Sequence, residues 1–371
     1  MDKVAINKCD KYDVDEITDI LYTQFDALGI NLNEFNGKNI LIKPNLLTKR
    51  SPDKATTTNP ALVEAVCGIV MKSGGKLTIA DSPAGAYSQT ILKGLYKTCG
   101  MTEAAERTGA VLNYDVSYNE VRNPNGYTSK VFNFLTPVCN ADYIINICKL
   151  KTHSYTTLSA AVKNFFGCIP GTQKFEIHSR FKKRKDFFSM LTDLCKNICD
   201  TKTVLNITDA VVGMEGNGPS GGSPRHIGCI LSSANPFTLD LVHEKLVNLN
   251  EVPTVEISRQ RGYCPKSVSD VEIIGDDINE LIIKDFKKPD AVVRKVFDLV
   301  PAFLSPRPVI DNDKCAACLD CVKSCPVNTI ELINNKAFIH REKCIKCYCC
   351  QELCKFKAIK IKKNIIYKIF K

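Results

Sequence analysis

Eight of the nine cysteines at positions 315–354 constrain this chain more than any other feature, because they form two sets with identical spacing. Each set reads CxxCxxCxxxC, and the second set begins 29 residues after the first. The residues that follow repeat in the same register, since Ile330 corresponds to Ile359 and Leu332 to Ile361. Each half is therefore expected to contain a cysteine loop, a short strand, a turn and a second strand. Thiolates in this number and spacing are typical ligands of iron–sulfur clusters.

The spacing resembles that of bacterial two-cluster ferredoxins, in which the fourth cysteine of each set crosses to the other cluster. The resemblance implies two [4Fe-4S] clusters with these ligands: Cys315, Cys318, Cys321 and Cys354 for cluster 1, and Cys344, Cys347, Cys350 and Cys325 for cluster 2. The register matches Cys350 with Cys321 and leaves Cys349 as a bystander. A zinc ribbon is the alternative, but it would not need the CxxxCP arm. Lys355 replaces the second proline, which loosens a turn without removing a ligand.

The remaining cysteines bear on the cellular compartment. The chain has 19 cysteines, and those outside the two sets show no repeated CxxC spacing. Its first residues, MDKVAINKCDKYD, contain no apolar run of the signal-peptide type, and no stretch approaches the roughly 18 apolar residues of a spanning helix. We therefore expect a cytoplasmic protein with reduced thiols, no membrane span and an anaerobic host.

The formal net charge of +10 does not indicate a nucleic-acid partner. Much of the excess lies after residue 308, where eight cluster thiolates would offset about four charges. The basic segment 355–371 can be interpreted as a membrane-surface or nucleic-acid segment. Its match to the first repeat favours a final pair of strands with lysines on the solvent face.

Strands and helices alternate through the first 300 residues, which predicts an α/β fold with a mixed, mostly parallel sheet and flanking helices. A small α+β ferredoxin-like domain is expected to follow. We assign the α/β domain to residues 1–300, a proline-marked linker to 301–308 and the ferredoxin domain to 309–371. The length of 371 residues suits two or three domains.

Polar residues end four of the predicted strands, and the carboxyl ends of strands in such sheets form binding sites. We predict a site in which ammonium groups bind an anion and carboxylates act as acid, base or metal ligand. The predicted catalytic residues are Lys43, Asp81, Lys151 and Asp209. The predicted substrate-binding residues are Asn45, Lys149, His153, Lys163, Asn164, Glu215, Gly216 and Gly218. The alternative is that solvated strand ends are often polar without any function.

The glycine-rich loop after Asp209 lacks both the GK[ST] ending of a nucleotide P-loop and the GxGxxG of a dinucleotide fold. Its backbone amides are instead expected to approach a phosphate or carboxylate. A flavin or an additional metal is compatible with the sequence, but no pattern indicates either. Cys168 has two interpretations, as a nucleophile or as a packed thiol in an apolar turn, and packing is the commoner role.

Four segments together resemble the domain of unknown function 362 family: IKPNLL, IADSP, KLKTHSYTTLSAAVKNFFGCIPG and TDAVVGMEGNGPSGG. The resemblance covers residues 38–242 and extends to the ferredoxin domain that commonly follows. It implies the domain order and the type of cluster, and it implies no reaction.

We expect an iron–sulfur oxidoreductase that relays single electrons through two clusters to the lysine–carboxylate site. Its partners would be a redox protein or low-potential electron donor and a small anionic molecule. One alternative is a ferredoxin-type electron carrier whose large domain docks a partner reductase. Another is a lyase or transferase in which the clusters are only structural.

Overall fold

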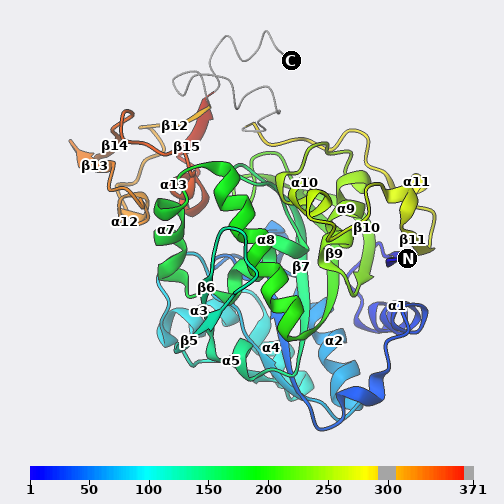
Figure 1. The fold of residues 1–371 in the computed structure, drawn as a ribbon. Helices are drawn as coiled ribbons and strands as arrows, with labels where there is room; N and C mark the ends of the chain where they lie inside the picture. Colours follow the sequence, from blue (N-terminus) through cyan, green and yellow to red (C-terminus); the bar gives the residue numbers. More distant parts are fainter. Residues whose placement is uncertain (291–305, 363–371) are drawn as a thin grey trace.

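The computed structural model describes residues 1–290 and 306–362, and its larger part is a mixed sheet between two layers of helices (Figure 1). The strand order is β11-β1-β10-β9-β7-β2-β3-β4, with β8 paired to β7. These strands are β1 (Lys3–Lys8), β2 (Asn39–Pro44), β3 (Lys76–Ile79), β4 (Val111–Leu112), β7 (Tyr143–His153), β8 (Thr157–Ser159), β9 (Thr203–Glu215), β10 (Ser223–Ser233) and β11 (Glu272–Gly275).

Strands β4, β3, β2, β7 and β9 run parallel to one another in this order. The sheet becomes antiparallel where β10 lies between β9 and β1. The sequence-based prediction of a mixed, mostly parallel α/β sheet is therefore confirmed. The parallel arrangement brings the carboxyl ends of β2, β3, β7 and β9 to one edge.

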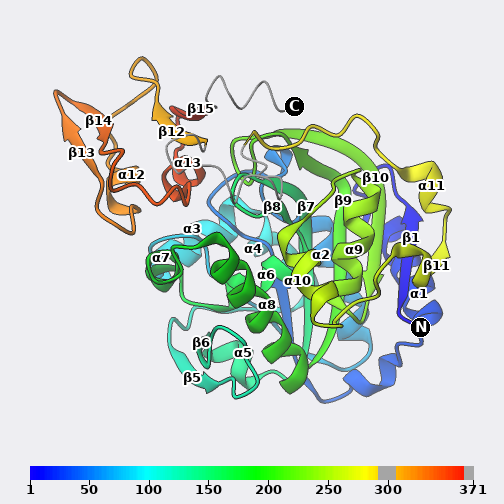
Figure 2. The same ribbon diagram turned by 45° about the horizontal axis from the view of Figure 1, so that its top comes forward.

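Both faces of the sheet are buried, which explains why its central strands are almost continuously apolar. Along β2, Ile40 and Ile42 pack into one core, whereas Leu41 packs into the other. The core that contains Ile42 is covered by α1 (Val14–Ala27), α2 (Pro60–Lys72), α3 (Gln89–Thr98) and α4 (Met101–Thr108). The opposite core is covered by α6 (Ala161–Asn164), α8 (Arg184–Thr201), α9 (Pro236–Leu246) and α10 (Pro253–Gln260) (Figure 2).

Local signals set the helix ends. The Asn59 side chain accepts a hydrogen bond from the Ala61 amide and Pro60 occupies the first turn, so α2 begins where the sequence predicted. The helix ends before Gly74, whose φ of +78° suits glycine. The remaining elements of this part are β5 (Tyr118–Arg122), β6 (Val131–Leu135), α5 (Thr136–Asn140), α7 (Gly171–Arg180) and α11 (Ile278–Leu281). The pair β5–β6 forms a separate two-stranded sheet.

In the smaller, C-terminal unit, the structure shows both predicted strands of the first cysteine repeat and the first predicted strand of the second. It contains β12 (Arg307–Ile310), α12 (Asp320–Lys323), β13 (Ile330–Ile333), β14 (Lys336–Ile339), α13 (Cys349–Leu353) and β15 (Ile359–Lys362). Strand β12 pairs with β15, and β13 pairs with β14. The predicted second strand of the other repeat, IIYKI, lies outside the described residues.

The predicted linker, residues 301–308, extends too far toward the C-terminus, because its last residues belong to a strand. Its residues 301–305 lie outside the described ranges, but Arg307 and Pro308 belong to β12 and pair with Lys362 and Ile361. Proline is tolerated here because β12 lies at the edge of a two-stranded sheet. Within residues 1–290 and 306–362, no helix is both long and apolar enough to cross a bilayer.

Candidate functional site

The cysteines assigned to cluster 1 gather around one small cavity in the C-terminal unit. Cys315, Cys318, Cys321 and Cys354 all line it, together with apolar side chains. Burial and the neighbouring thiols raise the pKa of Cys321 to about 11. The structure thus places Cys354, which belongs to the second set, beside the first three cysteines.

The cysteines assigned to cluster 2 form a matching group. The Cys344 thiol interacts with those of Cys347 and Cys325. Cys350 interacts with the same three thiols and also with Cys321 of the first set, and burial raises the pKa of Cys350 well above its usual value. Cys325 therefore lies with the second set, as an exchange of the fourth ligands requires. Four thiols gathered in this way fit a cubane cluster in each half.

The two halves also match in backbone detail. The Thr329 amide donates to Cys325 Sγ at 3.3 Å, and the Ala358 amide donates to Cys354 Sγ at the same distance. Hydrogen bonds to cluster sulfurs are one way in which a protein sets a reduction potential.

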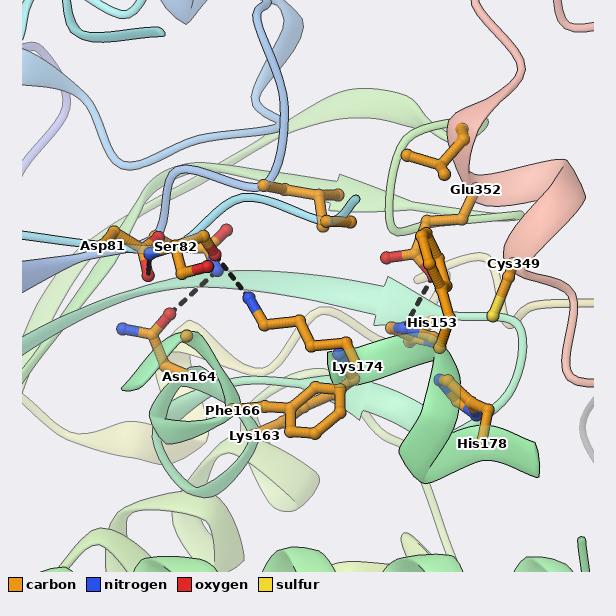
Figure 3. A pocket seen from close by; sticks show the side chains of 16 residues that line it. Asp81, Ser82, His153, Lys163, Asn164, Phe166, Lys174, His178, Cys349 and Glu352 are labelled. Carbon is orange, nitrogen blue, oxygen red and sulfur yellow. Dashed lines mark hydrogen bonds and ion pairs between the residues drawn. The ribbon is translucent and has the colours of Figure 1, made fainter. Parts of the chain in front are cut away.

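A second cavity, of about 50 Å³, lies between the two units at the carboxyl edge of the sheet (Figure 3). The loops after β2 and β3, the end of β7, and helices α6 and α7 form its walls on the α/β side. Helix α13 closes it from the C-terminal unit. The residues that line it are Asn45, Leu47, Asp81, Ser82, Ala84, His153, Lys163, Asn164, Phe166, Gly167, Lys174, Phe175, His178, Cys349, Glu352 and Leu353.

Asp81 and Lys43, both predicted to be catalytic, form a closed ion pair at the wall of this cavity. The Lys43 Nζ lies 2.7 Å from Asp81 Oδ1, and both side chains are buried. The Asp81 carboxylate also accepts hydrogen bonds from the Leu46 amide at 2.5 Å and the Ser82 amide at 2.9 Å. A Cβ at Gly167 would lie 2.0 Å from Asp81 Oδ1, so only glycine fits beside this pair.

Two further lysines bring positive charge to the cavity. The Lys174 Nζ donates to the carbonyls of Ser82 at 2.5 Å and Pro83 at 3.3 Å, and burial lowers the pKa of Lys174 to about 7. The Lys163 Nζ lies 5.7 Å from the centre of the Phe166 ring, and Lys174 approaches the same ring at 5.8 Å. Burial also lowers the pKa of Lys163. Within the described residues, Lys163 forms no hydrogen bond or ion pair.

His153 presents an N–H group to the cavity. Its Nδ1 accepts hydrogen bonds from the amides of Tyr155 at 3.0 Å and Thr156 at 3.4 Å, so the ring proton is on Nε2. The nearest acceptor to Nε2 is Glu352 Oε2, which is 3.8 Å away and beyond hydrogen-bonding distance. Burial lowers the pKa of His153 well below its usual value, so the ring is neutral.

His178 is the second buried imidazole of the cavity. Its ring stacks on Phe187 with centroids 4.3 Å apart, and its Nδ1 has no hydrogen-bond partner in the described part of the chain. Burial lowers the pKa of His178 to about 3, which makes this ring neutral as well.

Lys151 lies behind the cavity at the end of a chain of asparagine side chains. Its Nζ donates to the Thr56 carbonyl at 2.6 Å, and burial lowers the pKa of Lys151 to about 7. Each amide in the chain donates to the next side-chain oxygen, and the last amide donates to a backbone carbonyl. In order, the groups are Lys151, Asn45 at 2.5 Å, Asn164 at 2.8 Å, Asn146 at 2.7 Å, Asn206 at 2.9 Å and the carbonyl of Ser233 at 3.2 Å. The chain fixes Asn45 and Asn164 in the cavity wall.

Lys149 and Asp209, also predicted for the site, do not line the cavity. They are register partners on the neighbouring strands β7 and β9, and Lys149 Nζ lies 2.9 Å from Asp209 Oδ2. The Tyr12 hydroxyl donates to Asp209 at 2.7 Å, and the Asn59 amide donates to it at 2.8 Å. An irregularity in β7 between Lys149 and Lys151 separates the surroundings of these two lysines.

In the glycine-rich loop after β9, the two glycines predicted to bind an anion use their amides on backbone carbonyls of the protein. Glu215 accepts a hydrogen bond from the Lys287 amide at 3.1 Å, and the Gly216 amide donates to the Lys287 carbonyl at 2.7 Å. The Gly218 amide donates to the Gly216 carbonyl, and the Gly218 carbonyl accepts a hydrogen bond from the Ser154 amide.

Among the described residues, no three His, Cys, Asp or Glu side chains are grouped to hold a single metal ion.

The same loop holds α13 in place. The Ser220 hydroxyl donates to the Glu352 carbonyl at 2.5 Å, and Gln351 Nε2 donates to the Asn217 carbonyl at 3.2 Å. Nearby, the Tyr348 ring packs edge-on against the buried Tyr155 ring. These contacts make the C-terminal unit one wall of the cavity.

Sequence reasoning did not assign most of the residues that line the cavity to the site, among them Phe166, Lys174, His178, Cys349 and Glu352. Lys174 and His178 are four positions apart on α7, a spacing that places both on one helix face and was available as a signal. Cys168 is fully buried and its pKa is raised to about 12, which matches the packing interpretation.

The amino-acid sequence matches two family models. The model described as domain of unknown function (DUF362) matches residues 40–243, and the model described as 4Fe-4S dicluster domain matches residues 307–355. The chain is 30% identical over 306 residues to the thylakoid-associated protein sll1697 of Synechocystis sp., covering 80% of this chain and 90% of that protein.

Two solved structures are similar at a low level. One is a protein from Thermotoga maritima with 12% identity, a TM-score of 0.38 and coverage of 68% of this chain and 60% of that chain. The other is the lactate racemase apoprotein from Thermoanaerobacterium thermosaccharolyticum with 14% identity, a TM-score of 0.34 and coverage of 57% and 51%. This chain spans less than two thirds of either structure's length.

The family models and the two cysteine groups lead to the same conclusion. The chain is an iron–sulfur protein that belongs to the domain of unknown function (DUF362) family and carries a 4Fe-4S dicluster domain.

Proposed function

We propose that this protein is an oxidoreductase that transfers single electrons between two [4Fe-4S] clusters and a small anionic molecule bound in the interface cavity. The observation that carries the proposal is the position of α13. This helix supplies Cys349 and Glu352 to the cavity wall, and it also contains the cluster 2 ligand Cys350. A molecule in the cavity would lie beside a residue that adjoins a cluster ligand.

The clusters, when bound, supply one-electron transfer. The residues of this chain would bind and orient the substrate. Lys163 and Lys174 attract an anion, while the ion pair of Lys43 and Asp81 fixes the loop that forms the opposite wall. The buried side chains of Asn164 and Phe166 limit access of water, which strengthens these electrostatic contacts.

The two halves of the C-terminal unit differ in exposure, which suggests where electrons enter. Cys347 and Tyr348 of the second half are buried, with Tyr348 only 3% exposed. Their counterparts Cys318 and Leu319 are exposed, and Leu319 retains 38% of its accessible surface. We infer that a redox partner protein contacts the Cys318–Leu319 face, while cluster 2 serves the cavity. All 19 cysteines lie in the described residues and none of them forms a disulfide, which supports the proposed reduced, cytoplasmic and anaerobic setting.

Anaerobic stopped-flow spectroscopy tests the proposal. Protein with both clusters would be reduced with dithionite and mixed with a panel of small carboxylates and oxyanions, and reoxidation would be followed by visible absorbance. We expect saturable reoxidation by at least one compound, with a rate at least tenfold lower in Lys163→Met. Reduction of cytochrome c, which needs no cavity, should be equal in both proteins.

Two other outcomes would favour the alternatives. Rapid reduction of cytochrome c without reoxidation by any panel member would indicate an electron carrier whose large domain is a docking module. Conversion of a small molecule at a rate independent of the cluster redox state would indicate a lyase or transferase.

A further inference from the structure

The interface cavity offers hydrogen-bond donors almost without acceptors. Lysine has three N–H donors, and Lys163 directs none of them to another group in the described residues. Lys174 uses two donors on backbone carbonyls and keeps one. His153, which is 3% exposed, keeps its Nε2–H without an acceptor. An unsatisfied buried donor is costly, so the His153 Nε2–H favours a ligand that accepts hydrogen bonds, and the partly buried Lys163 can donate to the same ligand.

Most acceptors in the wall are already engaged; the exception is the Glu352 carboxylate, which lies 3.8 Å from His153 Nε2. The Asp81 oxygens pair with the Lys43 ammonium and accept hydrogen bonds from the amides of Leu46 and Ser82. The side-chain oxygens of Asn45 and Asn164 belong to the amide chain that starts at Lys151 and are likewise occupied. A ligand that brings its own donors would therefore find few partners.

The cavity charge sets the charge of the ligand. Lys163 and Lys174 face the cavity from α6 and α7, and Glu352 faces it from α13. The Lys43–Asp81 pair contributes no net charge. With both cavity lysines protonated, the balance is one positive charge, which suits a monoanion.

We propose that this cavity binds one compact monoanionic carboxylate or oxyanion of about four heavy atoms, since a water-sized atom needs roughly 10–15 Å³ of the 50 Å³ available. Its oxygens would accept hydrogen bonds from Lys163, Lys174 and the Nε2–H of His153. The inference rests on the proposed function in taking the cavity as the substrate site, but it concerns binding alone.

Anion binding should be linked to proton uptake. Lys174 is held at a pKa of about 7 by burial, with Asp81 opposing that effect and Lys43, Lys163 and Cys168 also nearby. His153 and His178 also face the cavity, but burial lowers the pKa of both rings and keeps them neutral. A bound anion favours the protonated lysine, so affinity should be highest below pH 7 and should fall as the pH rises above that value.

Isothermal titration calorimetry on the oxidised, cluster-loaded protein tests the inference. The probes are sodium formate, nitrite and acetate, with formamide as a neutral compound of similar size and benzoate as an anion that is too large. Lys163→Met and Lys174→Met should each weaken binding of the compact anions by roughly tenfold or more, because each removes a charged hydrogen bond. The matched control is Lys196→Met, which removes an exposed lysine of α8 that does not line the cavity.

Visible absorbance and melting temperature show whether each variant keeps its clusters and fold. Binding above pH 7 should take up protons, measured as a difference in heat between two buffers of different ionisation enthalpy. The proposal is overturned if no compact anion binds, if formamide binds as tightly as formate, or if neither lysine variant differs from Lys196→Met. Anion binding without reoxidation of the clusters would support this inference and refute the proposed function, so the two failures are distinguishable.

Discussion

Removal of the Asp209 carboxylate should destabilise the protein without weakening anion binding in the cavity. In Asp209→Ala, the buried Lys149 ammonium keeps only the Tyr12 hydroxyl as an acceptor, and the partly buried Tyr12 hydroxyl and Asn59 amide lose theirs. An unsatisfied buried donor costs about 1–3 kcal/mol, and breaking a buried ion pair costs about 3–5 kcal/mol. We expect the free energy of unfolding to fall by about 3–5 kcal/mol, which is less than the sum of these costs. The loss is limited because burial lowers the pKa of Lys149 and allows its ammonium group to lose a proton.

At about 2 °C per kcal/mol for a chain of this size, the melting temperature should fall by roughly 6–10 °C. Far-ultraviolet circular dichroism on anaerobic, cluster-loaded protein measures this fall. The double variant Lys149→Met with Asp209→Leu should recover about 1–3 kcal/mol relative to the sum of the single changes. Asp200→Ala, which breaks an exposed ion pair on α8, should cost at most about 1 kcal/mol. An Asp209→Ala protein of normal stability that has lost formate binding would refute this reasoning and restore the catalytic role first predicted.

Three further predictions concern other parts of the structure. The pKa of Lys174 is about 7 in the folded protein, against an ordinary value of 10.5, so the unfolded chain binds more protons between pH 7 and pH 10.5. The free energy of unfolding should therefore rise with pH across that window. In Lys174→Met, melting temperatures measured at a series of pH values should show a smaller rise. Gly167→Ala forces a Cβ to within 2.0 Å of a carboxylate oxygen and should cost about 1–3 kcal/mol in a melting experiment, whereas Gly68→Ala, in open space on α2, should be neutral or stabilising. Cys349→Ser should keep the iron content and both electron paramagnetic resonance signals, whereas Cys350→Ser should lose one signal; equal loss in both variants would contradict the assigned ligands.

Much of the fold could be predicted because local patterns determine it. The alternation of apolar strands with capped helices indicated a mostly parallel sheet, and the 29-residue repeat indicated the two halves of the C-terminal unit. The linker prediction was less successful, because a proline can mark either a connection or an edge strand such as β12.

The site was only partly predictable, because its composition depends on register and on docking. Lys149 and Asp209 end predicted strands, but their position opposite each other on β7 and β9 makes them partners of one another. Glu352 lies far from the α/β domain in sequence and reaches the cavity only because α13 packs on the loop after β9. Neither strand register nor the contact between two units is encoded in local residue patterns.

The chain of asparagine amides behind the cavity has a direction. At one end, Lys151 can only donate, and at the other end the carbonyl of residue 233 can only accept. Every amide between them must therefore point the same way, so a reversal of one would require a reversal of all. Asn206 lies within the sheet, yet its orientation decides which atom of Asn45 faces Lys151. The orientation of the amides in the cavity wall therefore depends on a carbonyl at the end of β10, two strands away from β7. The substitution Asn206→Asp would remove the donor to that carbonyl and would change the hydrogen bonds that lead to Lys151.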